Sequence, residues 1–183
     1  VNQVPVGNEG RFLIPWYMGE RTPDVPHAAA VYFGFALNDF TQAKLCRAVL
    51  EGHILNLYDG YKNMPVDATE IRLTGGLSQS QAWRQTIADV FEAEVVPVEG
   101  EGAAMGAALH AAWVWKKENG EAVELKDIVD SFVVLLEDQR CKPIPENVEV
   151  YRQAKEIFSS LSQRVRGYES ETDPFAGRVK MVS

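Results

Sequence analysis

Apolar positions recur at helical spacing between Thr41 and about Tyr61, in the most periodic stretch of the chain. This spacing predicts a helix, which Thr41 or Asp39 would cap and Pro65 would close. The residues that carry the period are Leu45, Val49, Leu57 and Tyr61.

After this helix, short apolar runs alternate with further helical stretches. The pattern predicts a strand at Glu70–Thr74, a helix at Ser80–Phe91, a strand at Glu94–Val98 and a helix at Gly102–Lys117. Such alternation favours parallel strands joined by crossover helices, and in sheets of this kind ligands gather at the carboxyl ends of the strands. The predicted class is therefore α/β.

The two ends of the chain are less regular. Residues 11–35 mix Pro, Gly and aromatic residues without a sustained period, which predicts short strands and loops. The run Val123–Leu136 begins with a helical pattern, but Phe132–Leu136 fits a buried strand equally well. A final helix is predicted next, and the tail at residues 170–183 is expected to be loosely held. The apolar face of that final helix is Val150, Tyr151, Ala154, Ile157, Phe158 and Leu161.

The composition limits the classes of partner. The chain has 183 residues, of which 46% are hydrophobic, enough for one ordinary core. Its formal charge of −8 argues against nucleic acid or an anionic membrane surface, because both are polyanions. The apolar run Ala103–Trp115 falls short of the roughly 20 residues that cross a bilayer. We therefore expect a small-molecule partner and a cytoplasmic location.

No residues show the spacing of a metal site. Cys46 and Cys141 are too far apart for a metal knuckle and fit reduced thiols of a cytosolic protein. His27, His53 and His110 form no ligand pattern either, so no protein-held metal is predicted. No basic and apolar leader stands at the start, so we expect no export. Because the sequence starts with Val1 rather than Met and continues with a polar stretch without periodicity, we expect it to begin inside a longer protein.

Gly75 and Gly76 stand at the carboxyl end of the predicted strand Glu70–Thr74. A glycine pair there has two explanations. It can serve an ordinary turn whose backbone angles suit glycine, or it can let a ligand contact the main chain. The pair alone leaves both explanations open.

The helix predicted at Gly102–Lys117 has a side with almost no side chains, which indicates that something packs very closely against it. Another element of the protein is the simpler occupant. A nucleotide base held between this helix and the Gly75–Gly76 turn would also need thin walls on both sides. The small residues are Gly102, Ala103, Gly106, Ala107 and Ala111.

Three segments in order resemble the carboxyl-terminal domain of the FGGY carbohydrate kinases. They are AVYFGFALNDFTQAKLCRAVLE at 30–51, LTGGLSQSQAWRQTIADVF at 73–91 and VPVEGEGAAMGAALHAAW at 96–113. Within that family, GERTP at 19–23 and WRQTIADVF at 83–91 look most like the xylulokinase branch. The resemblance covers roughly residues 10–115.

The resemblance implies a two-lobed actin-like ATPase fold, related to ribonuclease H, in which sugar and nucleotide meet between the lobes. Residues 1–183 would supply an incomplete carboxyl-terminal domain of the second lobe, with a core at about 10–117 and a helical extension at about 123–168. It also implies phosphoryl transfer from ATP, carrying Mg²⁺ on its phosphates, to a sugar hydroxyl, with D-xylulose becoming D-xylulose 5-phosphate. The catalytic aspartate and phosphate loops would lie in the amino-terminal remainder of the protein. No catalytic residue is therefore expected in this segment, and we expect the segment alone to be inactive.

Site residues follow from the resemblance position by position. In this family the glycine turn approaches the adenosine and phosphates, a Ser or Asn faces the base, and the small-residue helix lines the other side. The nucleotide candidates here are Gly75, Gly76, Leu77, Ser78, Ser80, Met105 and Gly106. Weaker candidates for the sugar side are Tyr17, Glu20 and Arg21, although a loop ion pair between Glu20 and Arg21 is the plainer reading.

The sequence also departs from the family. Ala28–Ala30 replace the usual Ala-Arg-Gly, and Phe35 and Lys44 differ from the usual residue types. Asp89 is expected to be a packing or capping partner rather than a catalytic base. A non-catalytic actin-like module, which binds a nucleotide or only a partner chain, is the alternative function. The identity of the sugar and the oligomeric state, a homo-oligomer included, stay open.

Overall fold

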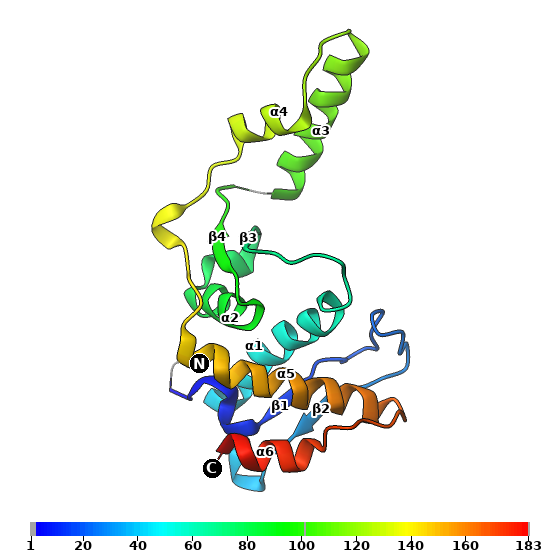
Figure 1. Cartoon of the computed structure of the whole chain (residues 1–183), viewed down its shortest axis with the longest axis vertical. Coiled ribbons are helices and arrows are strands. Elements are labelled where there is room, and N and C mark those ends of the chain that lie inside the picture. Colours follow the sequence, from blue (N-terminus) through cyan, green and yellow to red (C-terminus); the bar gives the residue numbers. More distant parts are fainter. Residues whose placement is uncertain (1–2, 101, 183) are drawn as a thin grey trace.

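The computed structural model describes residues 3–100 and 102–182. Figure 1 shows a body of packed helices and short strands, from which two helices extend as an arm. The strands are β1 (Phe12–Ile14), β2 (Val31–Phe33), β3 (Glu70–Leu73) and β4 (Glu94–Pro97). The α-helices are α1 (Gln42–Tyr61), α2 (Gln81–Phe91), α3 (Gly102–Glu118), α4 (Leu125–Phe132), α5 (Pro145–Val165) and α6 (Pro174–Val182). Short 3-10 segments are η1 (Val6–Gly10), η2 (Leu37–Asp39), η3 (Gly76–Gln79) and η4 (Glu137–Gln139).

The body contains a small antiparallel pair under α1. β1 pairs with β2, and Phe12 lies opposite Phe33. All three residues of β1 are buried, because α1 packs directly on this strand. The close approach depends on Gly52 of α1, where a Cβ atom would collide with the carbonyl oxygen of Leu13. The prediction of short strands in residues 11–35 is confirmed.

Helix α1 forms where predicted, but its buried side is not the one marked by the apolar period. The Thr41 hydroxyl caps the helix by accepting a hydrogen bond from the backbone N–H of Lys44 at 3.5 Å. Leu57, one of the periodic residues, is 61% exposed. The buried residues of α1 are Arg47, Ala48, Leu50, Glu51, Gly52, Ile54 and Leu55. Apolar spacing missed this side because two of its members are charged.

The predicted final helix is α5, which closes the core by packing on α1 and α2. Its start is held by Asp89 of α2, whose carboxylate accepts hydrogen bonds from the Ile144 N–H and the Asn147 side-chain amide, both at 2.8 Å. The prediction that Asp89 is a packing or capping partner is therefore confirmed. Val150, predicted on the apolar face, is only half-buried. The buried apolar residues of α5 are Val148, Tyr151, Ala154, Ile157, Phe158 and Leu161.

The expectation of a loosely held tail is wrong. Residues 174–182 form α6, which packs against α5 and η1. Gly177 lets α6 lie on Ile157, because a Cβ there would be 2.9 Å from the isoleucine side chain. The Arg178 side chain donates a hydrogen bond to the carbonyl of Gly10 at 3.1 Å. These contacts join the two ends of the described chain.

Strands β3 and β4 are parallel neighbours, with Leu73 opposite Pro97, and α2 makes the crossover between them. The predicted parallel arrangement is confirmed. At the other end of the pair, Arg140 donates hydrogen bonds to Glu70 at 2.8 Å and to Glu94 at 3.1 Å. Within the described part of the chain this sheet has two strands, so one edge of β3 has no strand beside it.

Helices α3 and α4 form the arm seen in Figure 1. The Trp113 indole N–H donates to the carbonyl of Val123 at 3.0 Å and so ties the end of α3 to the turn before α4. Leu109 and Ile128 are the buried residues of the two helices. A Cβ at Gly106 would meet no described atom within 4 Å. At Gly106, the close packing predicted for the small-residue side is therefore not supplied by residues 3–100 and 102–182, whereas Gly102 packs closely on Thr74.

The segment after α4 settles an alternative that the apolar pattern left open. Phe132 ends α4 and is 61% exposed, while Leu135 makes an isolated bridge to Val98. The helical start is confirmed. The segment after Phe132 is not a buried strand, although the Leu136 N–H donates to the carbonyl of Pro97 at 2.9 Å and so pairs it with the end of β4. None of the helices in the described ranges is both long and apolar enough to span a bilayer.

Candidate functional site

The chain turns sharply where β3 ends. Gly75 has φ +82° and ψ −174°, a conformation that glycine adopts far more readily than other residues, so the turn explains this glycine by itself. Gly76 is different, because its φ lies outside the left-handed region. A Cβ at Gly76 would meet no described atom within 4 Å. Neither backbone angle nor packing within the described chain requires glycine at this position.

The inner side of the turn is fixed by its own hydrogen bonds. The Ser78 backbone N–H and hydroxyl both donate to the carbonyl of Gly75, at 3.1 and 2.7 Å. Ser78 is 1% exposed, so its hydroxyl points into the protein. Ser78 is thus the buried residue of the turn, whereas the predicted site residues Gly75, Gly76 and Leu77 are exposed.

The outer side of the turn is open. Leu77 is 55% exposed, and Gly75 and Gly76 are exposed beside it. Ser80 is half-buried at the start of α2, and its side chain makes no capping hydrogen bond to the helix. The first N–H groups of α2 therefore lie next to a bare stretch of main chain.

The turn is joined to the start of α3. The Gly102 N–H donates to the Thr74 hydroxyl at 3.0 Å, and a Cβ at Gly102 would collide with that threonine. One turn further along α3, Met105 is half-buried and Gly106 is exposed. Thr74 thus connects the Gly75–Gly76 turn to the start of α3, the two segments that the sequence predicted on either side of a nucleotide base.

A groove of about 780 Å³, here called the β3 groove, runs beside the turn between α1, α2 and β3. Thr74, Leu77 and Ser78 line it from the turn, and Glu20 lines it from the GERTP loop. The remaining lining residues are mainly apolar and include His53, Leu57 and Trp83. One predicted sugar-side residue and three residues of the turn region therefore share one hollow.

Glu20 is held in a fixed position. Its carboxylate accepts hydrogen bonds from the Asn56 side-chain amide at 3.0 Å and from the backbone N–H of Arg21 at 2.7 Å. Asn56 in turn accepts a hydrogen bond from the buried indole of Trp16 at 2.9 Å. Among the described residues Glu20 forms no ion pair, so the expected Glu20–Arg21 pair is not formed.

Tyr17 and Arg21 do not line the β3 groove. The ring centroid of Tyr17 lies 6.4 Å from that of His53, which does line it. Burial, followed by the hydrogen bond with Tyr32, raises the pKa of Tyr17 to about 12. The phenol is therefore neutral near pH 7. Arg21 is exposed.

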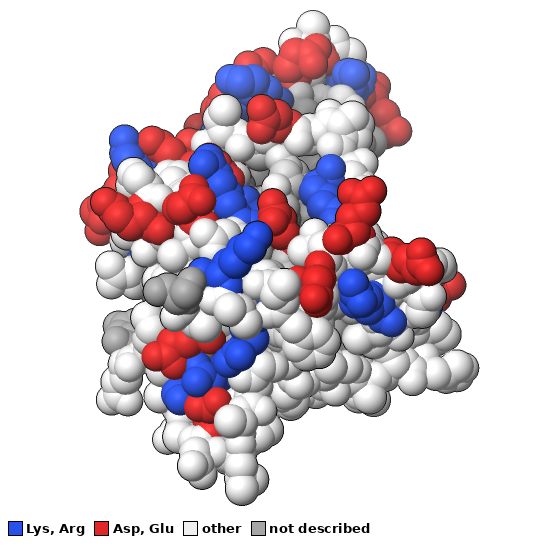
Figure 2. All heavy atoms as spheres, turned by 60° about the horizontal axis from the view of Figure 1, so that its bottom comes forward, with Lys and Arg blue, Asp and Glu red and all other residues white. Residues whose placement is uncertain are grey.

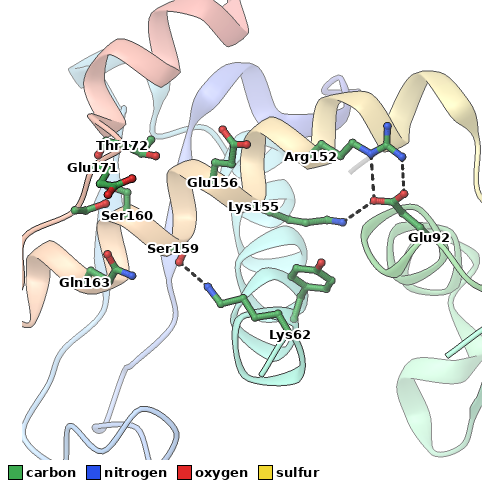
Figure 3. A pocket seen from close by; sticks show the side chains of 12 residues that line it. Lys62, Glu92, Arg152, Lys155, Glu156, Ser159, Ser160, Gln163, Glu171 and Thr172 are labelled. Carbon is green, nitrogen blue, oxygen red and sulfur yellow. Dashed lines mark hydrogen bonds and ion pairs between the residues drawn. The ribbon is translucent and has the colours of Figure 1, made fainter. Parts of the chain in front are cut away.

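A second hollow, of about 620 Å³, lies between α5, the end of α1 and residues 170–172 (Figure 3). Several of its charged side chains have partners across the hollow. Glu92 accepts from Arg152 at 2.7 Å and from Lys155 at 3.0 Å, and Lys62 donates to the Ser159 hydroxyl at 2.7 Å. These pairs tie α1 and α2 to α5, which gives them a structural role.

Charge and possible metal ligands add little to the site. Figure 2 shows acidic and basic side chains intermixed on one face of the molecule rather than separated by sign. Within residues 3–100 and 102–182, no group of three or more His, Cys, Asp or Glu side chains could hold a metal ion. Cys46 is exposed and Cys141 is buried, and both are free thiols.

Two residues of the site escaped the reading of the sequence. Thr74 links the turn to α3, and Arg84 reaches back from α2 to donate a hydrogen bond to the carbonyl of Ser78 at 2.6 Å. A polar residue directly before a glycine pair was a signal for Thr74. For Arg84 the signal was an arginine inside an apolar helical stretch, a place where charge is costly unless it has a partner.

A comparison with protein families matches residues 3–115 to "FGGY family of carbohydrate kinases, C-terminal domain". The xylulose kinase of Haemophilus influenzae is 37% identical over 166 residues, which cover 88% of this chain and 33% of that protein. The gluconokinase of Bacillus subtilis is 32% identical over 168 residues, which cover 88% of this chain and 31% of that protein. The chain thus spans about a third of the length of these curated relatives.

Solved structures share the fold. A ligand-bound xylulose kinase from Lactobacillus acidophilus superposes with a TM-score of 0.77 at 24% identity, over 90% of this chain and 33% of the other. A gluconate kinase from the same organism gives 0.76 at 24% identity, again over 90% and 33%. The predicted actin-like ATPase fold, present here as a partial carboxyl-terminal domain, is confirmed. This chain belongs to the FGGY family of carbohydrate kinases.

Proposed function

We propose that this chain is the carboxyl-terminal part of an ATP-dependent sugar kinase, and that its Gly75–Ser80 turn receives the adenosine side of ATP. Gly76 carries the proposal, because nothing in the described chain requires a glycine there. A ligand in contact with the main chain would require one. The first N–H groups of α2 lie beside this backbone and favour a negatively charged ligand.

The other residues take roles around that contact. Met105 and Gly106 form the second wall for the adenine, since Thr74 ties the start of α3 to the turn. Glu20 is the candidate on the sugar side, because it lines the same groove as the turn. Tyr17 and Arg21 are weaker candidates, because they lie outside the groove lining.

Phosphoryl transfer needs a group that orients the attacking hydroxyl, loops that hold the phosphates, and Mg²⁺ on the phosphate oxygens. We assign the first two to the remainder of the protein, with the orienting group and one phosphate loop in the amino-terminal lobe, and the third to the bound ATP. A sugar hydroxyl would then attack the terminal phosphate. The free thiols Cys46 and Cys141 support a reducing compartment such as the cytoplasm.

We propose D-xylulose as the sugar, and D-gluconate as the second candidate because a gluconokinase is 32% identical over most of this chain. The test measures ADP release by the full-length protein with ATP and Mg²⁺ on D-xylulose, D-gluconate and glycerol. Turnover on D-xylulose is expected. Turnover on D-gluconate alone would transfer the function to the second candidate, turnover on glycerol alone would refute both sugars, and no turnover would favour a non-catalytic module.

The role of the turn is tested by Gly76→Val in the full-length protein. The open space around Gly76 predicts little loss of thermal stability, while a branched side chain between backbone and ligand would raise the KM for ATP about tenfold or more. Gln79→Val is the matched control, because it places the same side chain on an exposed position of the same turn. Equal losses of stability and affinity in Gly76→Val would favour a plain structural turn.

A further inference from the structure

Arg84 is a buried arginine without an acidic partner. It lies in the first turns of α2 and is 6% exposed. No ion pair joins it to a carboxylate in the described residues, whereas Arg140 and Arg152 each pair with glutamates. A buried guanidinium is costly unless its hydrogen bonds are satisfied, so a specific contact is expected to justify its position.

That contact is with the turn at the end of β3. One terminal nitrogen of Arg84 donates to the carbonyl of Ser78 at 2.6 Å, and the bond is buried. Among the described residues the Arg84 Nε–H has no hydrogen-bond partner. The guanidinium therefore keeps one unsatisfied hydrogen-bond donor, which a purely stabilising role would not explain. Its identified acceptor is the Ser78 carbonyl.

The bond acts on the buried inner side of the turn, behind the exposed main chain of Gly75 and Gly76. Ser78 is already bonded to the carbonyl of Gly75 through its N–H and its hydroxyl. The backbone N–H of Arg84 also donates to the carbonyl of Ser80 at 3.0 Å. Arg84 thus holds the turn at two points, with its side chain at Ser78 and its main chain at Ser80.

We propose that Arg84 is a positioning residue, which sets the backbone of the Gly75–Ser80 turn for the nucleotide without touching the nucleotide itself. The inference rests on the proposed function of the turn. Since Arg84 is buried and directed at Ser78, it acts through the main chain. Its planar, forked guanidinium can hold this geometry, whereas a lysine ammonium offers a single charged point.

The test compares three variants of the full-length protein. Arg84→Met keeps the length of the side chain and removes the hydrogen bond, and we expect it to raise the KM for ATP about tenfold while the KM for the sugar stays within about twofold. Arg84→Lys should recover part of this loss. Arg140→Met is the matched control, because Arg140 braces the opposite end of β3. It should lower thermal stability without changing the KM for ATP.

Hydrogen exchange gives a readout that does not depend on activity. The amides of Ser78 and Ser80 are bonded within the turn and should exchange at least about tenfold faster in Arg84→Met than in the wild type. A parallel rise in both KM values, or unchanged ATP affinity with unchanged exchange, would overturn the inference. Should Arg84→Met fail to fold, the same comparison in Arg84→Lys decides.

The two proposals fail in different ways. Absence of kinase turnover by the wild-type protein would refute the proposed function, and the exchange of the turn amides would then decide the role of Arg84 in ordering the turn. Turnover by the wild type, with an unchanged KM for ATP in Arg84→Met, would refute the positioning role alone.

Discussion

The body and the arm of this chain differ in how they bury their residues. In the body, α5 packs on α1, α6 and β1, α1 also packs on β1, and Phe158 is 1% exposed. In the arm, α3 presents exposed alanines and the exposed Gly106, and Trp115 is 62% exposed. The body has its partners within the chain. On the small-residue side of the arm, Gly106 has no packing partner among the described residues.

The largest expected effect is on the free energy of unfolding, when a large aromatic side chain is truncated in each region. Phe158→Ala removes a buried ring from the body and should cost about 3–5 kcal/mol of unfolding free energy. Trp115→Ala removes an exposed ring from the arm and should change it by less than about 0.5 kcal/mol. Urea unfolding of this chain measures both. Similar losses for the two variants would show that the arm is packed as tightly as the body.

A buried carboxylate gives the body a pH-dependent stability. Glu51 accepts hydrogen bonds from the Gly7 N–H and the Tyr151 hydroxyl, both at 2.9 Å. Burial raises its pKa to about 7 from 4.5, although Arg47 and these hydrogen bonds act in the opposite direction. Because the folded state holds the proton more tightly than the unfolded state, ionisation of Glu51 destabilises the fold as the pH rises from about 4.5 to about 7.

The variant Glu51→Gln isolates this effect. Its amide oxygen can keep both acceptor contacts, and it has no charge to bury. Relative to the wild type, the variant should gain roughly 3 kcal/mol of unfolding free energy between pH 4.5 and pH 7. Urea unfolding at the two pH values measures the difference, in which the other titrating groups cancel. A difference that does not change with pH would contradict the buried ionisation.

The smallest effect concerns the arm. Gly106→Ala places a methyl group where the described chain has open space, so it should stabilise α3 in this chain by about 0.5–1 kcal/mol. In the full-length protein the same methyl group would stand in the proposed adenine wall and raise the KM for ATP. Ala108→Ser, at another exposed position of α3, is the control for both measurements. An unchanged KM in Gly106→Ala would remove Gly106 from the site.

Structure that depends on neighbouring residues could be predicted from the sequence, whereas structure that depends on distant residues could not. Local signals were sufficient for the Thr41 cap of α1 and for the parallel pair β3–β4, because caps and apolar runs act over a few residues. They were insufficient for the buried side of α1, where the partners of Glu51 lie 44 and 100 residues away. The tail was mispredicted for the same reason, since Arg178 bonds to Gly10 across the whole chain.

The residues of the candidate site also divide into those marked by a local sequence signal and those placed by contacts with other segments. The position of Gly75 and Gly76 at a strand end marked the turn, because glycine is a strong local signal. Arg84 was missed, because its acceptor is the backbone carbonyl of Ser78, which no residue type announces. Glu20 was placed beside the turn by Asn56 of α1, a contact across 36 residues.

The most direct test of the account compares this chain with the full-length protein in one assay. Residues 1–183 and the full-length protein are each given ATP, Mg²⁺ and D-xylulose. ATP binding is measured by calorimetry and turnover by ADP release. We expect weak or no ATP binding and no turnover by residues 1–183, and both ATP binding and turnover by the full-length protein. Sugar-dependent turnover by residues 1–183 would contradict it, because the groups assigned to the rest of the protein would then have to lie in this chain.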